Sequence, residues 1–254
     1  MARRSCLSCL LILIVPGCAH VQRTESTVVP GLALHFDPAA GLDTIVYQRT
    51  ITHADRDSAA GTRTVVLQVV RSAANRSLLQ VEQRFPGGGG EIVDTAVAEL
   101  ATLRAVAHSS HQPTRTMRFT FEGNDAQGTV TAIRPAGDSV SPVRQSVGGP
   151  IFDSNVIDLV VAALPLHAGF STELPFFIYE RGGRVSMPVA VRDRATVAFA
   201  QLGERDVWIV SVGVPGAPAT VWVDTRTHSV LRVRYDITAR ALSFTDERVT
   251  PLHG

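Results

Sequence analysis

The chain has 254 residues, of which 45% are hydrophobic, and its 24 basic and 23 acidic residues give a formal net charge of +1. This balance argues against nucleic acid as a partner, because binding to nucleic acid requires many uncompensated cations. All the basic residues are arginine, and the length and apolar content are sufficient for one buried core.

The N-terminal segment has the pattern of an export signal. Arg3 and Arg4 form a positive end, and residues 10–15 form an apolar run far shorter than the roughly 20 residues of a membrane-spanning helix. A glycine then precedes Cys18. This arrangement resembles a bacterial lipobox, which implies that the signal peptide 1–17 is removed and that the thiol of Cys18 is acylated, with a chain such as palmitate. The alternative is an ordinary secretory signal with an unmodified cysteine.

The residues after the cysteine indicate where the protein is anchored. Ala19, rather than Asp, resembles the sorting preference of outer-membrane lipoproteins, so we expect the periplasmic face of the outer membrane. Residues 18–41 have no clear period and are predicted to be a tether. The remaining cysteines, Cys6 and Cys9, lie in the signal, so we expect no disulfide, cysteine nucleophile or thiolate metal site in the mature domain.

Residues 42–250 are predicted to form a single antiparallel β domain. Apolar and polar side chains alternate in segments such as 79–85, 117–122 and 231–237, which is typical of strands with one dry face and one wet face. Further strands are expected near 102–108, 184–192 and 194–201. The fold class expected is mainly β, as a curved antiparallel sheet, either a half-barrel or an open barrel.

One helix is expected near 154–164. Asp153 or Ser154 can cap it and Pro165 ends it, while Asn155 and Asp158 are polar positions among residues that are otherwise almost all apolar. A helix that is apolar around most of its circumference is surrounded by protein rather than lying on a surface. We therefore expect the curved sheet to enclose it.

The segment Trp222-Val-Asp-Thr-Arg-Thr227 is predicted to form a turn, in which Asp224 and Thr227 bind the backbone. With the arginine-bearing strand that follows, it resembles the lipoprotein carriers (LolA/LolB-like) and a related uncharacterised periplasmic β-protein family. Residues 100–108 and 164–169 also resemble that uncharacterised family, and the likeness spans roughly 90–246. The resemblance implies a half-barrel that shelters acyl chains beneath a helical lid, and it brings no catalytic residue.

An apolar ligand could be held by aromatic side chains on the concave face of such a sheet. The alternative is that each of them is an ordinary core residue, because alternating aromatic residues pack any sheet. The candidates for the ligand cavity are Phe119, Phe121, Phe176, Trp208 and Trp222.

Motifs of known enzymes are missing from the sequence. It has no G-x-S-x-G, H-E-x-x-H or G-x-x-x-x-G-K-[ST] pattern. The triplet Asp94-Thr95-Ala96 resembles the Asp-Thr-Gly loop of aspartic proteases, but that chemistry needs two carboxylates and only one such triplet is present. His108 and His111 would point to opposite faces of a strand. We therefore expect no metal and no cofactor.

The sequence thus favours a lipid-anchored envelope protein without enzymatic activity, which either binds an apolar, acyl-like molecule or serves as a scaffold. A hydrolase that uses the Asp94 triplet is one alternative. A structural subunit that pairs through exposed strand edges is another. These functions differ in whether the concave side of the sheet is filled by the helix or leaves an open space for a small molecule.

Overall fold

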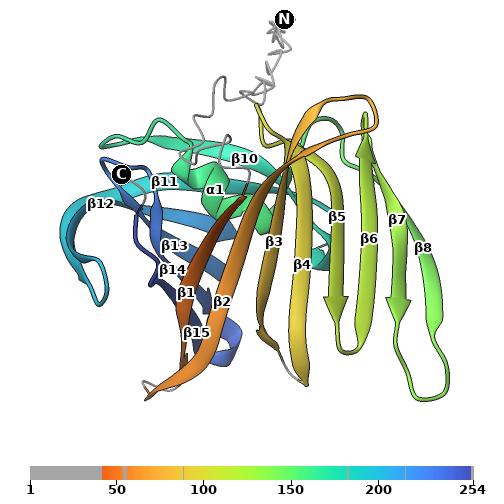
Figure 1. The fold of residues 1–254 in the computed structure, drawn as a ribbon, viewed down its shortest axis with the longest axis horizontal. Coiled ribbons are helices and arrows are strands. Elements are labelled where there is room, and N and C mark those ends of the chain that lie inside the picture. Colours follow the sequence, from red (N-terminus) through yellow and green to blue (C-terminus); the bar gives the residue numbers. More distant parts are fainter. Residues whose placement is uncertain (1–41, 54–55, 88, 182, 215, 253–254) are drawn as a thin grey trace, which may run out of the picture.

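The structure, a computed structural model, describes residues 42–53, 56–87, 89–181, 183–214 and 216–252. The expected signal peptide, Cys18 and the tether lie outside the described residues. Fifteen strands form a single sheet in the order β8-β7-β6-β5-β4-β3-β2-β1-β15-β14-β13-β12-β11-β10-β9 (Figure 1). All neighbouring strands are antiparallel except β9 and β10, which pair in parallel. The predicted fold class, a mainly β protein with one curved antiparallel sheet, is confirmed.

The strands in the first half of the chain are β1 (Leu42–His53), β2 (Arg56–Arg71), β3 (Ser77–Gly87), β4 (Gly90–Glu99), β5 (Ala105–Gln112), β6 (Arg115–Glu122), β7 (Asp125–Ala132) and β8 (Ser139–Ser146). The remaining strands are β9 (Phe152–Asp153), β10 (Ser171–Ile178), β11 (Gly183–Phe199), β12 (Gly203–Val214), β13 (Ala217–Asp224), β14 (Val230–Ile237) and β15 (Leu242–Arg248). Short 3-10 turns are η3 (Tyr179–Arg181) and η4 (Thr238–Arg240).

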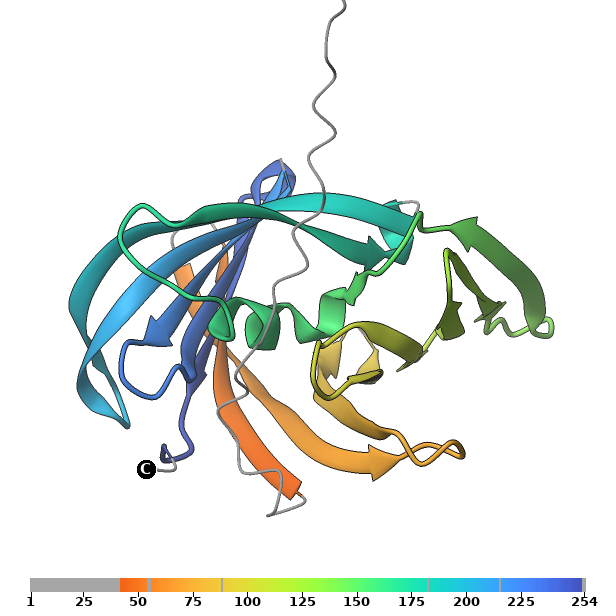
Figure 2. The same ribbon diagram turned by 90° about the horizontal axis from the view of Figure 1, so that it is seen from above.

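A single short helical segment crosses the space inside the curved sheet (Figure 2). It begins with the 3-10 turn η2 (Ser154–Val156) and continues as α1 (Ile157–Ala162). Asp153 caps η2, because its carboxylate accepts a hydrogen bond of 2.8 Å from the backbone N–H of Asn155. Val156 and Val160 are fully buried, as the apolar circumference of this segment predicts.

The main hydrophobic core lies between the helix and the strands around it. β3 illustrates the alternation that builds this core, because Leu79 and Val81 are fully buried while the intervening Gln80 is only half-buried. Val223 and Val233, from β13 and β14, close the same core from the other half of the sheet. The helix therefore forms the centre of the hydrophobic core, and both halves of the sheet pack against it.

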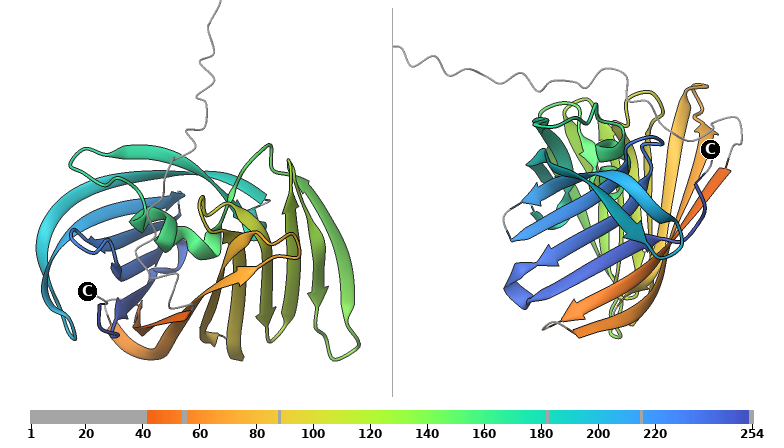
Figure 3. Two further views of the ribbon diagram at one scale, coloured as in Figure 1. Left: turned by 45° about the horizontal axis from the view of Figure 1, so that its top comes forward. Right: turned by 90° about the vertical axis from the view of Figure 1, so that its left-hand side faces the viewer.

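In the described residues the end strands β8 and β9 do not pair with each other, so the sheet is not closed, but aromatic side chains join its two halves. The ring centroid of Phe177 in β10 lies 5.3 Å from that of Phe119 and 5.0 Å from that of Phe121, both in β6. These contacts belong to a second, smaller core that also contains Met117 and Ile151. Strands β5 to β8 thus extend beyond the part of the sheet that wraps the helix (Figure 3).

Some strand boundaries differ from those that the sequence pattern indicates. The segment 102–108 was expected to be a strand, but β5 begins at Ala105 because Leu103 occupies a turn with φ of 57°. Segments 184–192 and 194–201 were expected to be two strands, but they form the single strand β11, which has an irregular register between Val191 and Asp193. Within the described residues, no helix combines the length and apolar character needed to span a bilayer.

Candidate functional site

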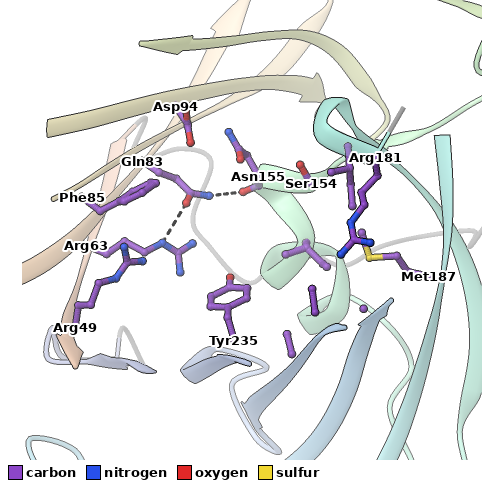
Figure 4. Close-up of a pocket in the computed structure, with 15 residues that line it drawn as sticks. Arg49, Arg63, Gln83, Phe85, Asp94, Ser154, Asn155, Arg181, Met187 and Tyr235 are labelled. Atoms are coloured by element: carbon purple, nitrogen blue, oxygen red, sulfur yellow. Dashed lines mark hydrogen bonds between the residues drawn. The ribbon is translucent and has the colours of Figure 1, made fainter. Parts of the chain in front are cut away.

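A cavity of about 370 Å³ remains between the start of the helical segment and the sheet (Figure 4). Its apolar wall includes Phe85, Ile157, Ile178, Met187 and Ala219. Polar side chains also line the cavity and come from seven different elements; they are Arg49, Arg63, Gln83, Asp94, Ser154, Asn155, Arg181 and Tyr235. The concave side is therefore partly filled by the helix and partly hollow.

The cavity reaches the surface on the side of η3 and β13. Arg181 and Ala217 line the cavity and are solvent-exposed, whereas Met187 and Ala219 are buried. Its size falls within the range of 300–1,000 Å³ that is typical of small-molecule sites.

One cluster of polar side chains in the cavity wall forms hydrogen bonds among its own members. Nη2 of Arg63 donates a hydrogen bond of 2.8 Å to Oδ2 of Asp158 on α1, and both side chains are buried. Nε of Arg63 donates to the amide oxygen of Gln83 at 3.1 Å. Gln83 in turn donates to the backbone carbonyl of Asn155. These contacts fix the helical segment to strands β2 and β3.

A second arginine extends this group to β1 and β15. Nε and Nη2 of Arg49 donate to the two carboxylate oxygens of Asp246 at 2.7 and 2.8 Å. Asp246 is completely buried, and its Oδ2 also lies 3.5 Å from Nη1 of Arg63. Two guanidinium groups and two carboxylates thus neutralise each other, and we call Arg49, Arg63, Asp158 and Asp246 the ionic quartet.

The charges of the quartet act on the ionisable groups around it. Burial alone would lower the pKa of Arg63, but the neighbouring Asp158 and Asp246 more than offset burial, so that the pKa is raised. Tyr235 also faces the cavity. Burial is the main cause that raises its pKa to about 12, although Arg63 opposes this effect. Arg63 therefore stays charged and Tyr235 stays neutral at physiological pH.

The other polar end of the cavity is unpaired. Oδ1 of Asp94 on β4 and Nδ2 of Asn155 on η2 are both buried, and neither has a hydrogen-bond partner in the described part of the chain. In Figure 4 the Asn155 amide extends toward the Asp94 carboxylate. Burial raises the pKa of Asp94, and a hydrogen bond with Ser110 opposes this effect. Such buried groups without partners are uncommon in proteins.

A histidine and a second carboxylate lie next to this end. Nδ1 of His108 is 2.9 Å from Oδ2 of Asp153, the residue that also caps η2. A smaller cavity of about 80 Å³ borders both residues and shares Asp94 and Asn155 with the larger one. Burial lowers the pKa of His108, but the charge and hydrogen bond of Asp153 outweigh it, and the pKa is raised.

The structure separates the two histidines that the sequence singled out. His108 shares the inward face with Asp94 and Ser110, while His111 is exposed on the opposite face. The triplet Asp94-Thr95-Ala96 lies in the middle of β4 and pairs with β3 and β5 on both sides. It is therefore not the active-site loop of an aspartic protease.

The five aromatic candidates are not among the residues that line the 370 Å³ cavity. Phe176 and Trp208 pack with the main core, whereas Phe119 and Phe121 pack in the second core against Phe177. Trp222 lies in a third cluster with Phe199, Val207 and Leu231. The structure therefore distributes the five side chains over three clusters.

The turn after β13 has the structure that its residues predict. Oδ1 of the buried Asp224 accepts hydrogen bonds from the backbone N–H groups of Arg226 and Thr227, at 2.9 and 2.8 Å. Oγ1 of Thr227 accepts a further bond of 3.4 Å from the N–H of Ser229. This turn is structural and lies apart from the residues that line the cavity.

The ionic quartet was not predicted from the sequence, although a signal was present. Arg63 occupies the same alternating positions as the buried Val65 and Leu67, and Asp158 is a charged position on an apolar helix. A charged side chain in phase with a buried face requires a partner. The partner could not be named, because Arg63 is 95 residues from Asp158 and 183 residues from Asp246.

Comparison with known proteins places the chain in a family. Among curated proteins none matches the sequence. A β-barrel-like protein of the domain of unknown function DUF1849 from Brucella abortus is similar, with 13% identity over 83% of this chain and 97% of that one and a TM-score of 0.46. A DUF1329 family protein from Desulfovibrio piger is 9% identical over 82% of this chain and 83% of its own, with a TM-score of 0.27. The model of the family described as protein of unknown function (DUF3108) matches residues 46–241. Because this match spans most of the chain, the protein belongs to the DUF3108 family.

Proposed function

We propose that this protein is a lipid-anchored protein of the bacterial envelope that holds a small, largely apolar molecule in the cavity beside its helix. The observation that carries the proposal is a cavity of about 370 Å³ that persists between the sheet and the helical segment. Its wall combines apolar side chains with a few polar groups, which is the composition of small-molecule sites.

The size of the cavity limits the ligand. It has room for about a dozen non-hydrogen atoms, if each takes about the 30 Å³ that a water molecule occupies in the liquid. An acyl-like chain of this size would contact Ile157, Met187 and Ala219. This ligand class agrees with the resemblance to the lipoprotein carriers.

The proposed anchor places this cavity at a membrane. Acylation of Cys18, followed by Ala19, would hold the protein at the periplasmic face of the outer membrane, with residues 18–41 as the spacer. Labelled palmitate fed to cells should appear on the protein, and the variant Cys18→Ser should remain unlabelled. A wild-type protein that carries no label would contradict the anchor.

The ligand is tested by removing the space for it. Ala219 is buried and lines the cavity, so Ala219→Leu should fill the space, whereas Ala198→Leu on an exposed position of β11 is the matched control. We expect native mass spectrometry of the purified protein to reveal a bound small molecule in the wild type and in Ala198→Leu, and at least tenfold less of it in Ala219→Leu. Equal occupancy in all three proteins would contradict the proposed site.

A further inference from the structure

Unpaired polar atoms in the cavity wall indicate which head group its ligand has. We propose that the cavity selects an apolar chain that ends in a neutral hydroxyl group, which donates a hydrogen bond to Oδ1 of Asp94 and accepts one from Nδ2 of Asn155. This inference rests on the proposed function and deepens it. The observation behind it is that these two buried atoms, one an acceptor and one a donor, have no partner in the described part of the chain and both belong to residues that line the cavity.

A carboxylate head group fits this end poorly. It would face the carboxylate of Asp94, and like charges in a buried site repel each other. The guanidinium groups of Arg49 and Arg63 offer little net attraction, because Asp246 and Asp158 already neutralise them. Arg181 is exposed, so solvent screens its charge.

An ammonium head group fits no better. It could donate to Oδ1 of Asp94, but it has no lone pair to accept a hydrogen bond from Nδ2 of Asn155, which would stay unpaired. A hydroxyl group can both donate and accept, so it matches an unpaired carboxylate oxygen and an unpaired amide nitrogen at once. The apolar wall formed by Phe85, Ile157 and Met187 then receives the chain.

Four probes with the same chain test this choice. They are 1-decanol, decanoate, decylamine and decane, and their binding to the full chain carrying Cys18→Ser, purified without detergent, is measured by isothermal titration calorimetry at pH 7. We expect 1-decanol to bind at least about tenfold more tightly than each of the other three, because a hydrogen bond to a charged group has about this effect.

Two variants test whether the preference for decanol arises from Asp94 and Asn155. Asp94→Asn removes the carboxylate charge and should reduce the preference for decanol over decanoate to less than about threefold. Asn155→Ala should weaken decanol binding, while the bond from Gln83 to the Asn155 backbone carbonyl is retained. Asp125→Asn, which alters an ion pair with Arg144 on the β7–β8 hairpin, is the control and should leave the preference unchanged.

The outcomes distinguish this inference from the proposed function. If decane, decanoate or decylamine binds as tightly as decanol, the hydroxyl preference is wrong and the apolar cavity remains a ligand site. The same conclusion holds if Asp94→Asn keeps the full preference. If none of the four probes binds, the proposed function itself is wrong.

Discussion

The two polar ends of the cavity differ in how their charges are satisfied. At one end the ionic quartet forms close hydrogen bonds, and its members are nearly inaccessible to solvent. At the other end Asp94 and Asn155 each keep a buried atom without a partner within the described chain. A paired network serves to hold the helix in place, since a buried charge without its partner is costly. An unpaired donor and acceptor on a cavity wall serve instead to contact something that enters.

The largest effect is expected from breaking the quartet. Asp158→Asn removes the charge that faces Arg63 at 2.8 Å, and the buried guanidinium then keeps its bond to the neutral Gln83 and the longer contact of 3.5 Å to the carboxylate of Asp246. We expect the free energy of unfolding to fall by about 3–5 kcal/mol. Urea unfolding followed by circular dichroism measures this. A loss below about 1 kcal/mol would mean that the quartet does not secure the helix.

The same type of substitution at the unpaired end, Asp94→Asn, should not destabilise the protein. Asp94→Asn removes a carboxylate whose ionised form is disfavoured by burial, so the free energy of unfolding should stay within about 1 kcal/mol of the wild type or increase. The same urea experiment at pH 7 compares the two variants directly. A destabilisation as large as that of Asp158→Asn would remove the distinction between the two ends.

The stability of the protein should depend on pH through His108. Its folded-state pKa is raised by Asp153, so its stabilising contribution is complete below the unfolded pKa of about 6.5 and is lost as the pH rises through the folded value. We expect the free energy of unfolding to decline in this window above about pH 6.5. His108→Gln should flatten this decline, whereas His111→Gln on the opposite face should keep it. A profile unchanged by His108→Gln would contradict the role of this pair.

The smallest effect, on the affinity for 1-decanol, is expected from substitution of the two tryptophans. Neither Trp208 nor Trp222 lines the cavity, so Trp208→Phe and Trp222→Phe should each change the affinity for 1-decanol by less than about threefold. Titration calorimetry checks both variants against Ala219→Leu, which should abolish binding. A tenfold loss in either tryptophan variant would move the ligand toward the aromatic clusters.

The repeating pattern of the sequence predicted most of the sheet and the enclosed helix, because alternation and the apolar helical face are local properties. Three strands lacked that signal, and one of them, β9, has only two residues. β8 contains Pro142 and is largely exposed at one edge, and β10 contains Pro175, so neither shows the usual alternation. Tertiary pairing with β7 and with β11 forms these strands nonetheless.

The candidate site was less accessible to sequence reasoning than the fold. Asp94 and His108 were noticed as residue types, but their common face with Asp153 depends on the pairing of β4 with β5 and on the position of the helical segment. The cavity arises where strands from both halves of the chain meet one turn of helix. A hollow of this kind depends on how well side chains fill the space, which no local pattern encodes.

The most direct test of the cavity as a ligand site is a crystal structure of the protein grown with 1-decanol. We predict electron density for one chain between η2 and the sheet, with its oxygen within about 3.2 Å of both Oδ1 of Asp94 and Nδ2 of Asn155. Density for the alcohol elsewhere on the molecule, with this cavity filled by rearranged side chains, would contradict the account.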